Sequence, residues 1–354
     1  MKIFSFTLFT TVLLRLVGAS AQGVAVPDSA EGQRLFADTS VLAFTLTAPF
    51  QRLLKDRGDK PSPHLAQLSY TVAGSEVRML PAKLTVRGNF RRKRANCQFP
   101  PLFLDVSKKK ADNTPFANQK KLKLVTHCQN EEYVVREYLV YRLYNLLTDY
   151  SFRARLCKVT YVDSAGKLKP ETRWAALLED EDDLVKRNGG TPNKLRQLNA
   201  YDMDSLSMAT VAVFEYLIGN TDWSVPYRHN IRLLTVPAPA QPVPVPYDFD
   251  HAGIVETDYA VPAEQLGIAS VRERLYRGLA YPPALFQRVF DRFNQLKPQF
   301  YALYQNDPRL SPAYVKRTLR YFDDFYATIN KPATVRAIFL GGNRSKVVIK
   351  GLNN

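Results

Sequence analysis

The stretch that decides the predicted fold is GNTDWSVPYRHN at residues 219–230, followed after a proline-rich gap by PYDFD at residues 246–250. It places Asp222 and Asn230 ahead of an Asp-x-Asp pair, on a loop, a strand and a second loop. Carboxylate and amide oxygens are the ligands that hard cations such as Mg²⁺ prefer. A further acid can orient a hydroxyl group or a water molecule. The stretch therefore predicts a site that handles a metal ion and phosphate.

The sequence around this stretch predicts a mainly helical scaffold. Asp204 can cap a helix whose apolar face ends at Gly219. Residues 231–236 read as a strand. Residues 237–246 hold five prolines, which favours a protruding connection over a central strand. Two aromatic-rich amphipathic segments follow and predict helices over residues 284–304 and 312–329.

The first half of the chain is predicted to be rich in strands, with one long helix. Glu131 to Leu147 has a wide apolar stripe at helical spacing and two acids in its first turn, where the helix dipole favours them. Apolar, β-branched segments bounded by turn residues predict strands. These segments are residues 40–47, 68–72, 77–80, 83–86, 99–106, 121–125, 154–162 and 172–178.

The order of these elements predicts an α+β protein. The acidic run that begins at Glu179 opens a polar connection and marks the boundary between the two halves. A cleft between two such halves is where small ligands usually bind. The predicted divisions are an export signal (1–21), a lead-in (22–39), a β-rich half (40–179), a helical half with the metal-site hairpin (180–339) and a basic tail (340–354).

Residues 1–21 have the pattern of an export signal. Lys2 precedes a largely apolar run, and Ala19-Ser20-Ala21 fits the rule for small residues at a cleavage site. No later segment approaches the length of apolar sequence that spans a membrane. We therefore expect a soluble exported protein, periplasmic or secreted, with no transmembrane segment once the signal is removed.

The net charge favours anionic partners. It is +16 for the whole chain and +14 without Lys2 and Arg15, which leave with the signal. Nucleotides, acidic proteins and acidic envelope components are candidates. Nucleic acid is not favoured, because the basic runs lack an organised base-stacking motif. The apolar fraction of 45%, with 12% aromatic residues, supports a folded core.

Three cysteines, Cys97, Cys128 and Cys157, leave one thiol over in any pairing. A Cys97–Cys128 disulfide is favoured, because each of these residues lies beside a predicted strand end in the same half. Three free thiols are the alternative. A zinc site has no support, since neither a C-x-x-C nor an H-E-x-x-H motif occurs.

Taken in order, the parts resemble the arrangement of protein kinases, in which an acid orients the acceptor hydroxyl while a downstream Asn and an Asp before Phe hold the metal. The chain resembles exported bacterial members of the CotH family of atypical kinases, and more distantly HipA-type and lipid-kinase-type proteins. The matching segments are RGN at 87–89, KLKL at 121–124 before a helix with Arg136, LLE at 177–179, GNTD at 219–222, HN at 229–230 and YDFD at 247–250.

This resemblance implies a two-lobed kinase-like fold that binds Mg²⁺ and ATP, or another nucleotide, and transfers a phosphoryl group to a protein hydroxyl. Asp222 would position the hydroxyl, Asn230 and Asp248 would hold Mg²⁺, and Asp250 would share a second ion. The implied nucleotide contacts are a turn of Arg87, Gly88 and Asn89, a lysine (Lys123 or Lys93) with Glu137 as its acidic partner, and an adenine hinge at Leu178 and Glu179.

Alternatives remain for the site and for the function. Asp222 and Asn220 can be read as a turn that caps the preceding helix, and the Asp-x-Asp pair as exposed hairpin residues. The export signal, the charge and the basic Lys108–Lys110 loop also fit a catalytically inactive pseudokinase-type protein that binds the envelope.

Overall fold

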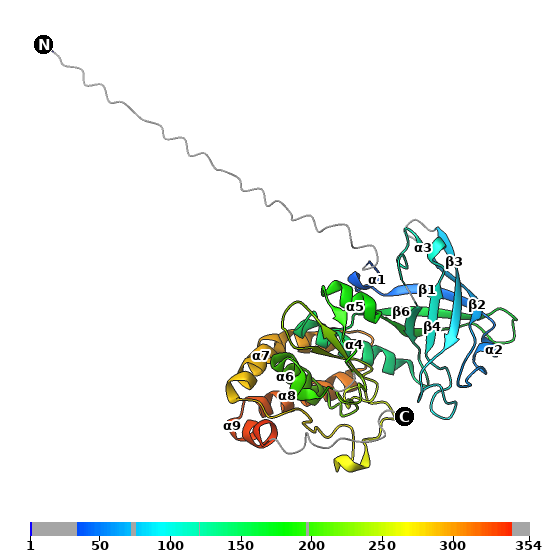
Figure 1. Cartoon of the computed structure of the whole chain (residues 1–354). Coiled ribbons are helices and arrows are strands. Elements are labelled where there is room, and N and C mark those ends of the chain that lie inside the picture. Colours follow the sequence, from blue (N-terminus) through cyan, green and yellow to red (C-terminus); the bar gives the residue numbers. More distant parts are fainter. Residues whose placement is uncertain (2–33, 72–75, 120, 196–197, 342–354) are drawn as a thin grey trace.

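The structure is a computed structural model that describes residue 1 and residues 34–71, 76–119, 121–195 and 198–341. Residues 2–21 of the predicted export signal, residues 22–33 of the lead-in and the tail after residue 341 lie outside this part of the chain. Figure 1 shows the strands gathered at one end of the molecule and the long helices at the other. Among the described helices, none is long and apolar enough to cross a membrane.

Seven strands of the first half close into a β-barrel. Alternate apolar residues face its interior, where Leu46, Leu84 and Leu104 are fully buried. The barrel closes because β1 pairs antiparallel with β2 on one side and parallel with β6 on the other. In sequence order the strands are β1 (Leu42–Ala48), β2 (His64–Thr71), β3 (Val77–Val86), β4 (Leu102–Val106), β5 (Lys121–Val125), β6 (Ala154–Asp163) and β7 (Glu171–Leu178).

The expected two-lobed, protein-kinase-like fold is wrong. The chain is α+β, but its first seven strands form a closed mixed barrel in the order β1-β2-β3-β4-β5-β7-β6. The contact that closes it aligns Leu42 with Cys157 in a parallel register. Local alternation of apolar residues says which face of a strand is buried, but it does not say which distant strand lies beside it.

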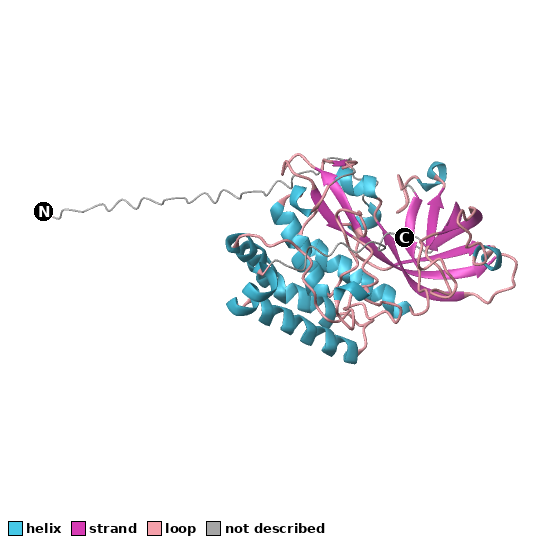
Figure 2. Cartoon of the chain, turned by 60° about the horizontal axis from the view of Figure 1, so that its bottom comes forward, coloured by secondary structure: helices cyan, strands magenta, loops and turns pink. Residues whose placement is uncertain are grey.

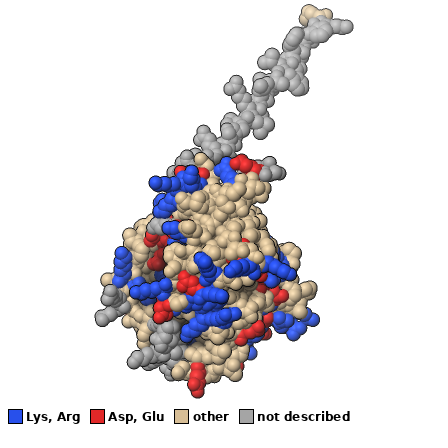
Figure 3. Space-filling model, turned by 90° about the vertical axis from the view of Figure 1, so that its right-hand side faces the viewer, with Lys and Arg blue, Asp and Glu red and all other residues tan. Residues whose placement is uncertain are grey.

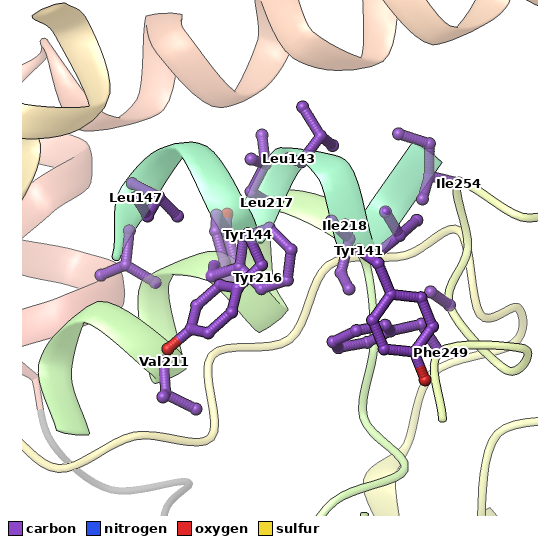
Figure 4. Packing of buried hydrophobic residues seen from close by; sticks show 14 of the residues in the cluster. Tyr141, Leu143, Tyr144, Leu147, Val211, Tyr216, Leu217, Ile218, Phe249 and Ile254 are labelled. Atoms are coloured by element: carbon purple, nitrogen blue, oxygen red, sulfur yellow. The ribbon is translucent and has the colours of Figure 1, made fainter. Parts of the chain in front are cut away.

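The helical half is built around a core that also takes in α4 (Glu131–Leu147) from the first half. Asn130 caps α4 by accepting from the N–H of Glu132. Figure 2 shows the long helices gathered at one side and the barrel strands at the other, and Figure 4 shows α4 and α6 packed through apolar side chains. The other helices are α6 (Ser205–Ile218), α7 (Pro283–Gln305), α8 (Pro312–Ile329), and the shorter α1 (Arg34–Ala37), α2 (Phe50–Leu53), α3 (Lys108–Ala111), α5 (Glu181–Arg187) and α9 (Pro332–Val335).

A small sheet carries the Asp-x-Asp segment. Its strands are β8 (Thr191–Pro192), β9 (Ile231–Thr235) and β10 (Val243–Pro246), in the order β10-β9-β8. The end of the proline run thus forms an edge strand, a position where proline is tolerated because its missing N–H faces away from the sheet. The antiparallel β9–β10 pair returns the chain to its start, where the N–H of Tyr247 donates to the carbonyl of Asn230 at 3.0 Å.

The Cys97–Cys128 disulfide is confirmed, with the two Cα atoms 4.9 Å apart. It ties the end of the loop between β3 and β4 to the segment that leads into α4. Cys157 is a buried free thiol, and burial raises its pKa to about 12, so it is unreactive at neutral pH.

Candidate functional site

The end of helix α6 sets the position of Asp222. The helix begins at the cap residue Asp204 and stops at Gly219, which adopts the left-handed conformation (φ 69°) that favours glycine. The side chain of Asn220 then accepts from the N–H of Asp222 at 3.0 Å. Asn220 therefore makes the turn that the alternative interpretation assigned to the pair, and the carboxylate of Asp222 is left for other contacts.

Asp222, His229 and Asn230 form a hydrogen-bonded cluster. Oδ1 of Asp222 lies 2.9 Å from Nε2 of His229, and Oδ2 accepts from Nδ2 of Asn230 at 3.0 Å. The same amide nitrogen donates to the main-chain oxygen of Asp222 at 2.8 Å. Because this nitrogen faces Asp222, Oδ1 of Asn230 has no hydrogen-bond partner among the described residues.

Phe249 anchors the two aspartates on either side of it. Its fully buried ring packs against Tyr141 of α4, with the ring centres 4.9 Å apart, and the two rings lie side by side in Figure 4. The hydroxyl of Tyr141 accepts from the N–H of Asp248 at 2.9 Å, and Asp248 takes a positive φ of 63°. Tyr141, which belongs to this buried aromatic core, thus fixes the backbone of the segment that carries Asp248 and Asp250.

Arg91 joins the barrel to these aspartates. Its guanidinium contacts three carboxylates: Asp248 (Nη2–Oδ1, 2.8 Å), Asp250 (Nε–Oδ2, 3.2 Å) and Glu137 of α4 (Nη1–Oε2, 3.5 Å). The loop that carries it is held by Arg57, whose Nη1 donates to the carbonyl of Cys97 at 2.6 Å. Arg91 is buried, so these ion pairs are shielded from solvent.

The surroundings push the pKa values of the two aspartates in opposite directions. Burial raises the pKa of Asp250, although Arg91 opposes the rise. Burial also acts on Asp248, but Arg91, Arg87 and Lys123 outweigh it and lower the pKa of that carboxyl. Asp248 is therefore the carboxylate held firmly ionised, and 35% of its side chain is exposed. An ionised, accessible carboxylate is the kind that can contact a bound cation.

One cavity of about 600 Å³ lies where the barrel loops meet the segments after α6 and β10. Arg87 and Lys123 contribute cationic groups to its wall, and neither has an ion-pair partner among the described residues. Arg87 lies against the ring of Phe103, with 5.4 Å from Cζ to the ring centre, and Nζ of Lys123 is 5.4 Å from the ring centre of Tyr247. Unpaired cations above an ionised aspartate make the cavity suited to an anion that carries its own metal ion.

Eight of the predicted site residues line this cavity, although they come from distant parts of the sequence. Gly88 has a positive φ of 89°, as a tight turn over the cavity requires. Glu137 lies directly behind the wall, against Arg91. The eight are Arg87, Gly88, Asn89, Lys123, Asp222, Asn230, Asp248 and Asp250.

Besides Glu137, three predicted residues do not belong to the cavity lining. Lys93 is exposed on the loop beyond Arg91, so the structure favours Lys123 as the lysine of the site. Leu178 is buried and ends β7. Glu179 is committed to structure: it accepts from Nε of Arg187 at 3.0 Å and from the N–H of Arg153 at 2.9 Å. The predicted adenine hinge is therefore not part of this cavity.

Sequence reasoning missed Arg91, Tyr247 and Arg232 as site residues. Arg91 stands in a run of four consecutive cations, and nothing in the run distinguishes the one that turns inward. Tyr247 lies against two cations, with Cζ of Arg232 4.6 Å from its ring centre and Lys123 near the same ring. Tyr247 belongs to the YDFD motif, but only the fold brings its cationic neighbours to it.

Comparison with protein-family models finds no match for the chain, and no curated protein matches it either.

The chemistry of the donor set fits a metal ion that arrives with phosphate. No described cluster of three or more His, Cys, Asp or Glu side chains could hold a metal ion by itself. Mg²⁺, however, often keeps several waters and is held by one or two protein oxygens together with substrate phosphates. Asp248 keeps its second oxygen and Asn230 its Oδ1 without a protein partner among the described residues, and both residues line the cavity.

The pKa of Lys123 leads to a prediction on pH. Burial, helped by Arg87 and Arg232, lowers it to about 8, so the ammonium group is charged at pH 7 and loses its charge as the pH rises through 8. With Mg·ATP as the probe anion, we expect the dissociation constant measured by calorimetry to rise about tenfold between pH 7 and pH 9.5, because one charge-assisted contact is lost. Lys123→Arg should remove most of this dependence, since arginine stays charged. An equal rise in both proteins would contradict the assignment.

Proposed function

We propose that this protein binds a Mg²⁺·nucleotide, with ATP as the first candidate, in the 600 Å³ cavity, and transfers a phosphoryl group to a protein hydroxyl. The observation that carries the proposal is the convergence of a basic turn, a lysine, an Asp–Asn cluster and an ionised aspartate on one cavity. Its volume lies within the range of about 300–1,000 Å³ that is usual for small-ligand sites.

The polar and charged groups of the cavity would have two roles, phosphate binding and metal binding. Arg87, Lys123 and the N–H groups of the turn at Gly88 would contact the phosphate oxygens, because guanidinium, ammonium and main-chain donors all bind phosphate. Asp248 and Asn230 would hold Mg²⁺ against the same phosphates. Bound there, Mg²⁺ would offset the charge on the phosphate oxygens. Arg91 keeps Asp248 and Asp250 in place by fixing one oxygen of each.

Asp222 would position the acceptor. Its carboxylate lines the phosphate cavity, and its hydrogen bonds to His229 and Asn230 fix its orientation. A carboxylate held in this way can accept a hydrogen bond from a substrate hydroxyl and aim its oxygen at phosphorus. The residues that match the CotH family in order support the same activity. We propose membership of that family on the basis of these residues alone. We also propose that residues 1–21 direct export of the protein.

Calorimetric titration with Mg·ATP tests the nucleotide claim. Wild type should bind, and Asp248→Ala should weaken binding at least tenfold, because it removes the ionised oxygen that faces the metal. Asp105→Ala is the matched control, since Asp105 is exposed on the outside of the barrel and is expected to leave binding unchanged. Failure of the folded wild type to bind Mg·ATP or any other nucleoside triphosphate would remove the claim.

A non-catalytic envelope-binding role is the second candidate. Figure 3 shows Lys and Arg spread over the barrel side of the molecule, with fewer Asp and Glu between them. Lys108, Lys109 and Lys110 are exposed on α3 at this end of the protein. This role favours a salt-sensitive association with acidic polymers. The envelope-binding role would be favoured over phosphoryl transfer if charge reversal at these lysines abolished the cellular phenotype while Asp222→Asn left it intact.

A further inference from the structure

A second, smaller cavity borders on Asp222 as well. Its volume is about 120 Å³, and Asp222 and His251 line both this cavity and the phosphate cavity. The remaining walls are mainly apolar and come from the segment after Tyr259, through Val261, Ala263 and Leu266. A group bound in the small cavity would therefore lie next to Asp222 and close to the phosphate cavity.

The segment that forms this cavity is firmly built. Leu266 and Leu275 form a small core of their own, with Ala263 and Ile268 packed against it. The carbonyl oxygen of Val271 lies so close to Gly253 that a Cβ atom at that position would clash with it, and a Cβ atom at Gly219 would lie 3.0 Å from the same oxygen. These contacts hold Val271, which lines the cavity, against the end of α6 and the segment after Asp250.

The rim of the cavity is apolar and open to solvent. Val261 is 73% exposed, although the core of this segment lies only a few residues away. An exposed valine at the mouth of an apolar cavity extends the surface that an incoming apolar group can cover. Burial of such a group here would remove both surfaces from water.

We propose that this cavity is an acceptor subsite that takes an apolar side chain adjacent to the hydroxyl residue of a protein substrate. The inference rests on the proposed function. The volume of 120 Å³ decides the class of occupant, because it is below the range of about 300–1,000 Å³ of small-molecule sites and suits a single side chain. The apolar walls favour Val, Leu or Ile over polar residues. Since Asp222 borders the cavity, the neighbouring hydroxyl would reach its carboxylate.

The test compares short peptides that differ at one position. The probes are acetylated and amidated pentapeptides with one Ser, flanked by Val, Leu, Asn or Asp. Binding is followed by NMR of methyl-labelled Ala263 and Leu266, with Mg·ATP present and absent. We expect the Val and Leu peptides to shift these methyl signals and to bind about tenfold more tightly than the Asn peptide, as is usual for a small apolar pocket.

Val261→Asp should abolish that preference and leave Mg·ATP binding unchanged, because Val261 does not line the phosphate cavity. Leu65→Asp is the matched control, as Leu65 is 76% exposed on the barrel and far from the site in sequence. Equal binding of all four peptides, or no methyl shift with any of them, would overturn the subsite. Failure of the wild-type protein to bind nucleotide would instead overturn the proposed function, and calorimetry measures nucleotide binding separately.

Discussion

Replacing Arg91 with Met is expected to lower the free energy of unfolding by about 3–5 kcal/mol, the usual cost of removing one partner from a buried ion pair. Arg91 faces Asp250 and Glu137, whose side chains are 8% and 4% exposed. Without the guanidinium, these carboxyls must share a buried site or take up protons. Met keeps much of the side-chain volume, so the loss reports charge more than packing.

The stability of Arg91→Met should also depend on pH, in a direction that the pKa values of the neighbouring carboxyls define. Burial raises the pKa of Glu137 to about 8 and also raises that of Asp250, and Arg91 lowers both. In Arg91→Met the two pKa values should rise further. The variant should therefore gain stability as the pH falls from 8 to 5, because its folded state holds protons on these carboxyls that the unfolded chain has lost, and holding them costs less free energy at lower pH. Urea unfolding at both pH values measures this. Arg94→Met is the control, since Arg94 is exposed; similar losses for both variants would refute the role of Arg91.

Asp222→Asn is expected to lower the turnover of Mg·ATP by about 10²–10⁴-fold, the range for removing a group that handles the acceptor proton. The measurement is ADP release in the presence of a Ser-containing peptide. Asn keeps the shape of Asp222 and can still bond to Asn230, so nucleotide binding should change little. A variant that turns over as fast as wild type would remove the assigned role. Asp105→Asn, on the outer face of β4, is the control.

The local elements of the fold could be predicted because each follows from a pattern in consecutive residues. Helix α4 spans Glu131–Leu147 as predicted, since its apolar stripe and first-turn acids are complete within that segment. Helix α6 likewise runs from its Asp204 cap to Gly219. Closure of the barrel could not be predicted. It depends on the parallel β1–β6 contact between remote segments, and the alternation of apolar residues is satisfied by other neighbours as well.

The residues of the candidate site also fall into those that could be predicted from the sequence and those that could not. Asp222, Asn230 and Asp248 could be predicted because they lie in one continuous segment with a helix end and a hairpin. Arg91 could not, because the path of its loop depends on bonds from Arg57 and on the disulfide at Cys97. The choice between the two lysines depended on the same loop, which leaves Lys93 exposed. Glu179 was misplaced because its partner Arg187 lies on a helix of the other half.

The central claim is that this cavity binds a nucleotide together with a divalent cation. The most direct test is electron paramagnetic resonance of Mn²⁺, which replaces Mg²⁺ at such oxygen sites. Free Mn²⁺ is measured with the protein alone, with ATP alone and with both. Too few oxygens of Asn230 and Asp248 are available to hold the ion without phosphate. We predict that the protein removes free Mn²⁺ beyond the amount bound by ATP only when both are present, and that Asp248→Ala abolishes this. Tight Mn²⁺ binding without ATP, or no effect of protein on Mn·ATP, would contradict the account.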